Sequence, residues 1–133
     1  MKELFDVHCH MVPGVDDGAA DLEESLAMLK MQHEDGVRKI IITPHYRRRM
    51  FETPAKKVHE QFLKLQEAAK KEYPDMSLYL GCELHSNMDL QDILEKRKYV
   101  TMAGSSYVLL EFSEGDSAQH ILERVYNVLS CGC

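Results

Sequence analysis

Histidines and aspartates lie close together near the N-terminus, in the stretch FDVHCHMVPGVDDG at residues 5–18. If this stretch begins as a strand, successive side chains point to opposite faces. His8 and His10 then share one face, and Cys9 lies on the other. Two imidazoles on one face, with carboxylates a few residues later, are typical ligands of a transition-metal ion. The stretch suggests metal chemistry, and the rest of the chain decides whether further ligands are present.

The elements that would position these side chains follow a regular order. β-Rich runs alternate with runs whose apolar residues recur at helical spacing. The expected strands are residues 4–10, 37–45, 77–83 and 106–112. The expected helices run from a cap at Asp21 to Gly36, from Pro54 as first helical residue to Tyr73, over residues 90–94, and from a cap at Ser117 to Leu129. This alternation predicts an α/β fold with a parallel sheet, about four β/α units in a single domain over residues 1–133.

Each expected strand ends in a side chain that can bind a metal ion. The four strands end in His8 and His10, in His45, in Glu83 and in Glu111. In α/β barrels, the C-terminal ends of several strands build the active site. Imidazole and carboxylate ligands suit Mn²⁺, Fe or Zn²⁺, and bridging carboxylates suit two or more ions. The regularity predicts a metal cluster, although any one such residue is also common on an exposed loop.

Two short runs near these ligands have two interpretations each. Residues 16–18, Asp-Asp-Gly, are turn formers, and Asp17 suits both a turn residue and a ligand. Residues 47–49 are three arginines directly after the second expected strand. They are either a solvated charge run or the source of one phosphate-binding guanidinium.

The remaining histidines are weaker candidates. His85 lies two residues beyond Glu83 and could share its face as an alternative ligand. The other three, His33, His59 and His120, fall within expected helices and suit ordinary surface positions.

Composition excludes several classes of protein. The chain has 133 residues, a formal net charge of −6 and a pI of about 5.6, whereas nucleic-acid binders are more often basic. Its apolar runs are shorter than the roughly 20 residues that span a bilayer. Because the sequence also shows no signal peptide, we expect a cytoplasmic protein without a membrane span.

The four cysteines do not match a thiol-dependent enzyme. Cysteine-dependent phosphatases need an arginine six residues after the cysteine, and Val15 and Met88 stand there after Cys9 and Cys82. Those two thiols are expected to be small buried apolar groups. The closely spaced Cys131 and Cys133 are expected to be reduced, with a soft-metal site or a disulfide as the alternatives.

Four motifs together identify a family. They are DVHCHMVPGVDDGAADLEESLAML, IIITPHYRRRMFETP, LYLGCELH and YVLLEF. They resemble the polymerase-and-histidinol-phosphatase (PHP) superfamily and, within it, the bacterial manganese-dependent protein-tyrosine phosphatases of capsular and exopolysaccharide operons. The resemblance runs from residue 3 to the last residue. It implies a partial, distorted (β/α)7 TIM-like barrel around a cluster of two to three metal ions.

The resemblance also implies roles for individual residues. The implied metal ligands are His8, His10, Asp17, His45, Glu83 and Glu111. Arg47, with His45, is the implied catalytic residue. Mn²⁺ is the expected metal, with Fe or Zn²⁺ as alternatives. The implied reaction is attack of metal-activated water on a phosphotyrosine, and the implied partner is an autokinase that controls polysaccharide export.

The chain departs from this family in length. A complete barrel of this kind needs about 250 residues, against 133 here. We therefore expect either a truncated form or a homo-oligomer in which a second copy completes the barrel. Two other hypotheses stay open: another PHP phosphoesterase, such as a histidinol-phosphatase, and an inactive metal-binding remnant that oligomerises.

Overall fold

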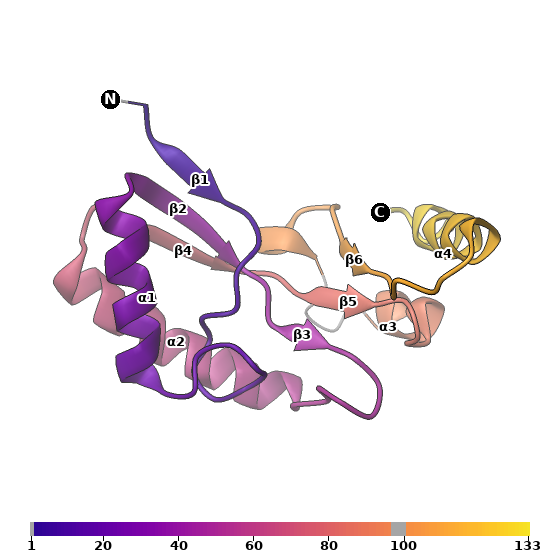
Figure 1. Ribbon diagram of the computed structural model, residues 1–133, viewed down its shortest axis with the longest axis horizontal. Coiled ribbons are helices and arrows are strands. Elements are labelled where there is room, and N and C mark those ends of the chain that lie inside the picture. Colours follow the sequence, from indigo (N-terminus) through magenta and orange to yellow (C-terminus); the bar gives the residue numbers. More distant parts are fainter. Residues whose placement is uncertain (1, 97–100) are drawn as a thin grey trace.

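The computed structural model of the protein describes residues 2–96 and 101–133. Its strands form two three-stranded sheets, ordered β1-β2-β4 and β3-β5-β6, and every pairing within them is parallel (Figure 1). The expected α/β fold with parallel pairing is confirmed, although one sheet has become two. The elements are β1 (Leu4–Asp6), α1 (Leu22–Glu34), β2 (Val37–Ile42), β3 (His45–Tyr46), α2 (Ala55–Glu72), β4 (Ser77–Leu80), β5 (Glu83–His85), α3 (Leu90–Glu95), the 3-10 helix η1 (Met102–Gly104), β6 (Leu109–Glu111) and α4 (Ala118–Ser130).

The second and third expected strands are each broken in two, which corrects the sequence prediction. Pro44 lies at the first break, between β2 and β3, and lacks the N–H that would continue a ladder. Gly81 lies at the second, between β4 and β5, where a Cβ would come within 2.9 Å of the Met102 sulfur. Gly81 N–H donates to Ile42 O at 2.8 Å, and Glu83 N–H donates to Pro44 O at 3.0 Å. Hydrogen bonds therefore cross both breaks and connect the two sheets.

The sequence predicted that the candidate ligands stand at the ends of strands, and for most of them this prediction is wrong. β1 ends at Asp6, whose carboxylate accepts the His8 N–H at 3.0 Å, so His8 and His10 lie in the loop that follows. His45 and Glu83 begin β3 and β5, because those strands start after the breaks. Glu111 does end its strand, β6.

The helices begin and end close to the expected positions. Asp21 caps α1, accepting from Glu24 N–H at 2.9 Å, and the Glu24 carboxylate accepts from Ala20 N–H at 2.7 Å. This pair resembles a capping box, except that Glu24 accepts from the residue before the cap and not from the cap itself. Gly36 follows the helix with φ +91°, which favours glycine. Pro54 is the N-cap of α2 and not its first residue, a shift of one position.

Each sheet packs on its own pair of helices (Figure 1). Leu29, Ile40 and Leu65 are fully buried where α1 and α2 meet the first sheet. Leu84 and Leu90 are buried where α3 and α4 meet the second. The first core is built from residues between Cys9 and Leu78 and the second from residues between Cys82 and Val128, with Tyr46 of β3 packed against the second. The candidate ligands lie where the two sheets join.

Two apolar faces remain exposed. On β1 and just after it, Phe5 is 60% exposed and Val7 55%. On α4, Leu122 is 69% exposed, Tyr126 72% and Leu129 61%. Within residues 2–96 and 101–133, no helix is long and apolar enough to cross a membrane.

Candidate metal centre

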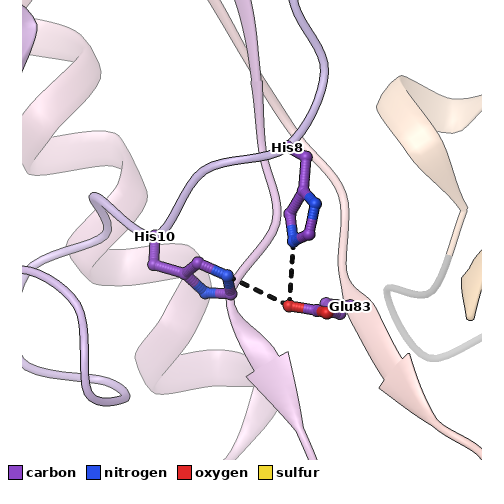
Figure 2. A group of neighbouring side chains, drawn as sticks. All are labelled: His8, His10 and Glu83. Atoms are coloured by element: carbon purple, nitrogen blue, oxygen red, sulfur yellow. Dashed lines mark hydrogen bonds and ion pairs between the residues drawn. The ribbon is translucent and has the colours of Figure 1, made fainter. Parts of the chain in front are cut away.

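Glu83 lies at the centre of a group of imidazoles. Its carboxylate is only 9% exposed, and one oxygen, Oε2, lies 3.0 Å from His8 Nε2 and 3.0 Å from His10 Nε2 (Figure 2). Both rings point at this oxygen from the loop after β1. Cys9, between them, points away and is buried in the first core. The expected division of this stretch into two faces is therefore confirmed, although the residues lie in a loop.

His45 faces a second set of carboxylates. Its Nδ1 lies 3.4 Å from Glu83 Oε2 and 3.5 Å from Glu111 Oε2, and its Nε2 lies 3.5 Å from Asp17 Oδ1. The ring is stacked between His10, at 4.3 Å between centroids, and Phe51, at 5.0 Å. β3 pairs His45 directly with Glu83 on β5, which fixes the spacing of these two residues. His45 thus connects the residues of the N-terminal loop with the glutamates of the second sheet.

The structure brings all six residues expected as ligands into three overlapping groups. In each group the possible ligand atoms lie within 4.8 Å of one another. The groups are His8, His10 and Glu83; His10, Asp17 and His45; and His45, Glu83 and Glu111. Any two groups share one residue. An arrangement of this kind suits ions in adjacent positions, and a carboxylate such as Glu83 has a second oxygen with which to bridge them.

The donor atoms fit a divalent cation. Two ligand atoms that each lie roughly 2.0–2.2 Å from one ion stand about 3 Å from each other. The Glu83 Oε2 atom lies at comparable distances from three ring nitrogens, 3.0 Å from His8 Nε2, 3.0 Å from His10 Nε2 and 3.4 Å from His45 Nδ1. Among the described residues, His45 Nδ1 and Glu111 Oε2 are buried without a hydrogen-bond partner. Burying such atoms unpaired costs about 1–3 kcal/mol each. A cation between them would remove that cost, and imidazole with carboxylate suits Zn²⁺, Fe or Mn²⁺.

Asp16 holds part of this site together, a role that the sequence did not reveal. Its carboxylate is 0% exposed and accepts the backbone N–H of His45 at 2.9 Å and of Gly18 at 2.9 Å. It also lies 3.1 Å from His10 Nδ1. Burial opposes its charge, but the bonds from His10, His45 and Gly18 hold the pKa of Asp16 below its usual value. The bond to Asp16 in turn raises the pKa of His10.

The three arginines after β3 occupy different environments. Arg47 is half-buried, and its Nε is a buried atom without a hydrogen-bond partner among the described residues. Its backbone pairs with Phe51 in both directions at 2.9 Å, which closes a tight turn. Arg48 and Arg49 are exposed at the tip of that turn. The geometry therefore favours Arg47 over its neighbours as a group held ready for an anion.

His85 belongs to none of the three groups. It is 3% exposed, its Nε2 lies 3.1 Å from the Ser113 hydroxyl, and its Nδ1 accepts the Asn87 N–H at 3.0 Å. These contacts hold it within the second half of the fold and argue against its role as an alternative ligand.

The other histidines lie on helices away from the metal-candidate groups. His33 lies in the last turn of α1, and its Nε2 lies 3.0 Å from an oxygen of Asp75, so it is more than an ordinary surface residue. His59 is on α2 and His120 on α4, as expected.

The thiols behave as the sequence predicts. Cys9 and Cys82 are buried, and burial raises the pKa of each to about 12, with the charge of Asp6 contributing at Cys9. Both are inert as nucleophiles near neutral pH. Cys131 and Cys133 are free and half-buried, so the structure contains no disulfide between them.

Comparisons with known proteins agree with this geometry. The family model for capsular polysaccharide synthesis, CpsB/CapC, matches residues 4–133. The tyrosine-protein phosphatase CpsB of Streptococcus pneumoniae is 40% identical over 129 residues, which are 97% of this chain and 53% of that protein. The tyrosine-protein phosphatase YwqE of Bacillus subtilis is 30% identical over 109 residues, 82% of this chain and 43% of that protein.

A solved structure is also similar. It comes from a study of YwqE from Bacillus subtilis and CpsB from Streptococcus pneumoniae, described as metal-dependent tyrosine phosphatases. It superposes with a TM-score of 0.85 at 27% identity, over 97% of this chain and 52% of that one. The chain thus spans about half the length of the relatives that it matches.

Proposed function

The chain belongs to the CpsB/CapC family of capsular polysaccharide synthesis, and on that premise we propose that it is a metal-dependent phosphatase of phosphotyrosine. The observation that carries the proposal is the convergence of imidazoles and carboxylates from four separate segments around Glu83 and His45. The tyrosine-protein phosphatases among its relatives support the substrate class. A role in capsular or exopolysaccharide synthesis is proposed with it.

Six side chains are proposed to bind two to three divalent cations. Mn²⁺ is proposed before Fe or Zn²⁺ on the family resemblance, because the ligand types suit all three. The proposed ligands are His8, His10, Asp17, His45, Glu83 and Glu111. His45 has one ring nitrogen toward Asp17 and the other toward Glu83 and Glu111, and a neutral imidazole offers a lone pair on only one of them. A neutral His45 can therefore bind a metal ion in only one of the two groups to which it belongs.

The chain's own residues provide binding and orientation. A divalent cation, when bound, would lower the pKa of a water molecule so that hydroxide is available as the nucleophile at neutral pH. It would also place positive charge beside the phosphoryl oxygens. Arg47 is proposed to hold the phosphate, because its Nε has no hydrogen-bond partner among the described residues and a guanidinium can form paired bonds to two oxygens. Asp17 is 64% exposed and His8 46%, which leaves the site open enough for a phosphotyrosine on the surface of another protein.

We also propose a specific fold and a specific protein substrate. The six parallel strands and four α-helices of the described residues are proposed to form part of a distorted (β/α)7 PHP barrel, an assignment supported by the structural likeness. The proposed protein substrate is the autokinase of a polysaccharide-export system, which the family resemblance implies.

Hydrolysis of a phosphotyrosine peptide by the metal-free chain, with and without added Mn²⁺, tests the proposal. We expect turnover only with the ion, and loss of turnover in Glu83→Gln. Glu95→Gln, on the exposed face of α3, is the matched control and should keep full activity. A faster reaction with histidinol phosphate would favour the other PHP phosphoesterases, and turnover unchanged in Glu83→Gln would exclude the proposed site.

The exposed apolar faces favour a second candidate function, a metal-binding module that oligomerises without hydrolysing phosphoesters. β1 is an edge strand, and its Phe5 is 60% exposed; Leu122 and Leu129 on α4 are exposed as well. Such faces favour association. A mass in solution above that of one chain, together with no phosphoester hydrolysis in the presence of Mn²⁺, would support this candidate.

A further inference from the structure

The buried carboxylate of Asp16 contacts two members of one metal-candidate group, His10 and His45, and lies next in sequence to the third, Asp17. One oxygen, Oδ2, lies 3.1 Å from His10 Nδ1 and accepts the His45 N–H at 2.9 Å. The other, Oδ1, accepts the Gly18 N–H at 2.9 Å and so closes a turn over Asp17. Asp16 is itself absent from all three candidate groups.

These contacts determine which nitrogen of His10 faces the ions. Both oxygens of Asp16 already accept backbone N–H groups, so the ring nitrogen that faces this carboxylate, Nδ1, is placed to donate a hydrogen bond to it. The Nε2 atom then points at Glu83 Oε2, 3.0 Å away, and is the atom free to bind a metal. A carboxylate behind a metal-binding histidine commonly fixes both its ring orientation and its protonation.

The same carboxylate joins two segments that are distant in the sequence. His45 begins β3, and its N–H is taken by Asp16 and not by a neighbouring strand. The Asp16 side chain is fully buried, so water does not compete for these bonds. Movement of the Asp16 loop would therefore displace the rings of both His10 and His45, which are stacked on each other.

We propose that Asp16 is a positioning residue that holds His10, Asp17 and His45 in place to bind one divalent cation. The inference rests on the proposed metal centre. It assigns to the Asp-Asp-Gly turn two separate tasks, since Asp17 faces the ion and Asp16 orients the ligands around it.

Three variants test this role, with Zn²⁺ as a diamagnetic probe. Asp16→Ala removes all three bonds, and Asp16→Asn retains one carbonyl oxygen that can accept from both His10 and His45. Asp75→Ala is the matched control, because Asp75 forms the same kind of bond with His33 away from the site. Each protein is titrated with Zn²⁺, the ring nitrogens of His10 are followed by NMR in the loaded protein, and amide exchange at Gly18 and His45 is followed in the metal-free protein.

We expect Asp16→Ala to bind Zn²⁺ about 10- to 100-fold more weakly. In the loaded variant, NMR should no longer find His10 bound to Zn²⁺ through Nε2 alone. Amide exchange at Gly18 and His45 should accelerate. Asp16→Asn should restore the state of His10 and the protection of His45, and Asp75→Ala should match the wild type. If Asp16→Ala does not fold, Asp16→Asn decides: slow exchange at His45 with fast exchange at Gly18 supports the proposal, and exchange unchanged at both overturns it.

Other outcomes separate this proposal from the proposed function. Weaker Zn²⁺ binding with His10 and both amides unchanged would make Asp16 a direct ligand and overturn the positioning role. A wild-type chain that binds no Zn²⁺ would contradict the metal centre. In that case, amide protection lost in Asp16→Ala would still support Asp16 as the organiser of this loop, and protection retained would overturn it.

Discussion

The imidazole rings of His10 and His45 are stacked, with 4.3 Å between centroids and 25° between planes, although they come from different segments. Two protonated rings at this distance would repel each other strongly, because the site is partly shielded from water. Four carboxylates, of Asp16, Asp17, Glu83 and Glu111, nevertheless lie within 3.5 Å of the two rings. A bound cation would balance these carboxylates and leave the rings neutral, which is the form of imidazole that binds metal.

His45→Ala should abolish the proposed activity, because it should prevent metal binding. His45 takes part in two of the three groups, so its removal leaves neither with more than two members. Elemental analysis of the purified variant after growth with Mn²⁺ measures the effect directly. His59→Ala, on the exposed face of α2, is the control. A metal content equal to that of the wild type would argue against the site.

Glu83→Gln should weaken metal binding by about 100-fold or more, since removing a residue that only orients a metal ligand already costs about 10- to 100-fold. The amide keeps the size of the side chain but loses the charge and one acceptor oxygen. Titration with Mn²⁺ measures the affinity, and the circular dichroism spectrum shows whether the fold is kept. An affinity within a few-fold of the wild type would mean that Glu83 is a structural partner of His8 and His10.

The convergence of the six candidate residues could be predicted from the sequence, because most of them follow apolar runs that form parallel strands. The sequence prediction missed the break at Pro44, although proline cannot donate to a ladder and so marks the position. The break at Gly81 has no such marker, because it depends on packing against Met102, which is distant in the sequence. The role of Asp16 was hidden for the same reason: a turn explains Asp-Asp-Gly fully, and only the folded chain brings the His45 N–H to it.

The pair of Asp16 and His10 should make the stability of the metal-free protein depend on pH. The pKa of Asp16 is lowered, so its stabilisation is present above the ordinary value of 3.8 and is lost as pH falls through the folded value. The pKa of His10 is raised, so its stabilisation is present below the ordinary value of 6.5 and is lost as pH rises through the folded value. The pair therefore contributes most between these two pH values.

Urea unfolding of the wild type and of Asp16→Ala across this pH range measures that contribution. The difference in unfolding free energy should be largest between the two ordinary values and should shrink on both sides. A difference that stays constant with pH would show that the pair is not ionised as described.

The cysteines should separate into two classes on alkylation of the native protein. Burial raises the pKa of Cys9 and Cys82 to about 12, so neither forms appreciable thiolate at mildly alkaline pH. Cys131 and Cys133 are half-buried and accessible. Mass spectrometry after iodoacetamide treatment should find label on the C-terminal pair only, and on all four in urea. Rapid native labelling of Cys9 would mean that the loop after β1 opens in solution.

Gly18→Ala should destabilise the protein and disturb the metal site together. A Cβ at this position would lie 2.0 Å from His10 O and 2.5 Å from His10 Cβ, so the loop must move away from the ligand. Forcing extra atoms into packed surroundings costs typically about 1–3 kcal/mol. Gly115→Ala is the matched control, because nothing lies within 4 Å of a Cβ there. Unfolding in urea measures the free energy of unfolding, and titration with Zn²⁺ measures the metal affinity. If Gly18→Ala and Gly115→Ala do not differ in either quantity, the loop after β1 does not pack against His10 in this way.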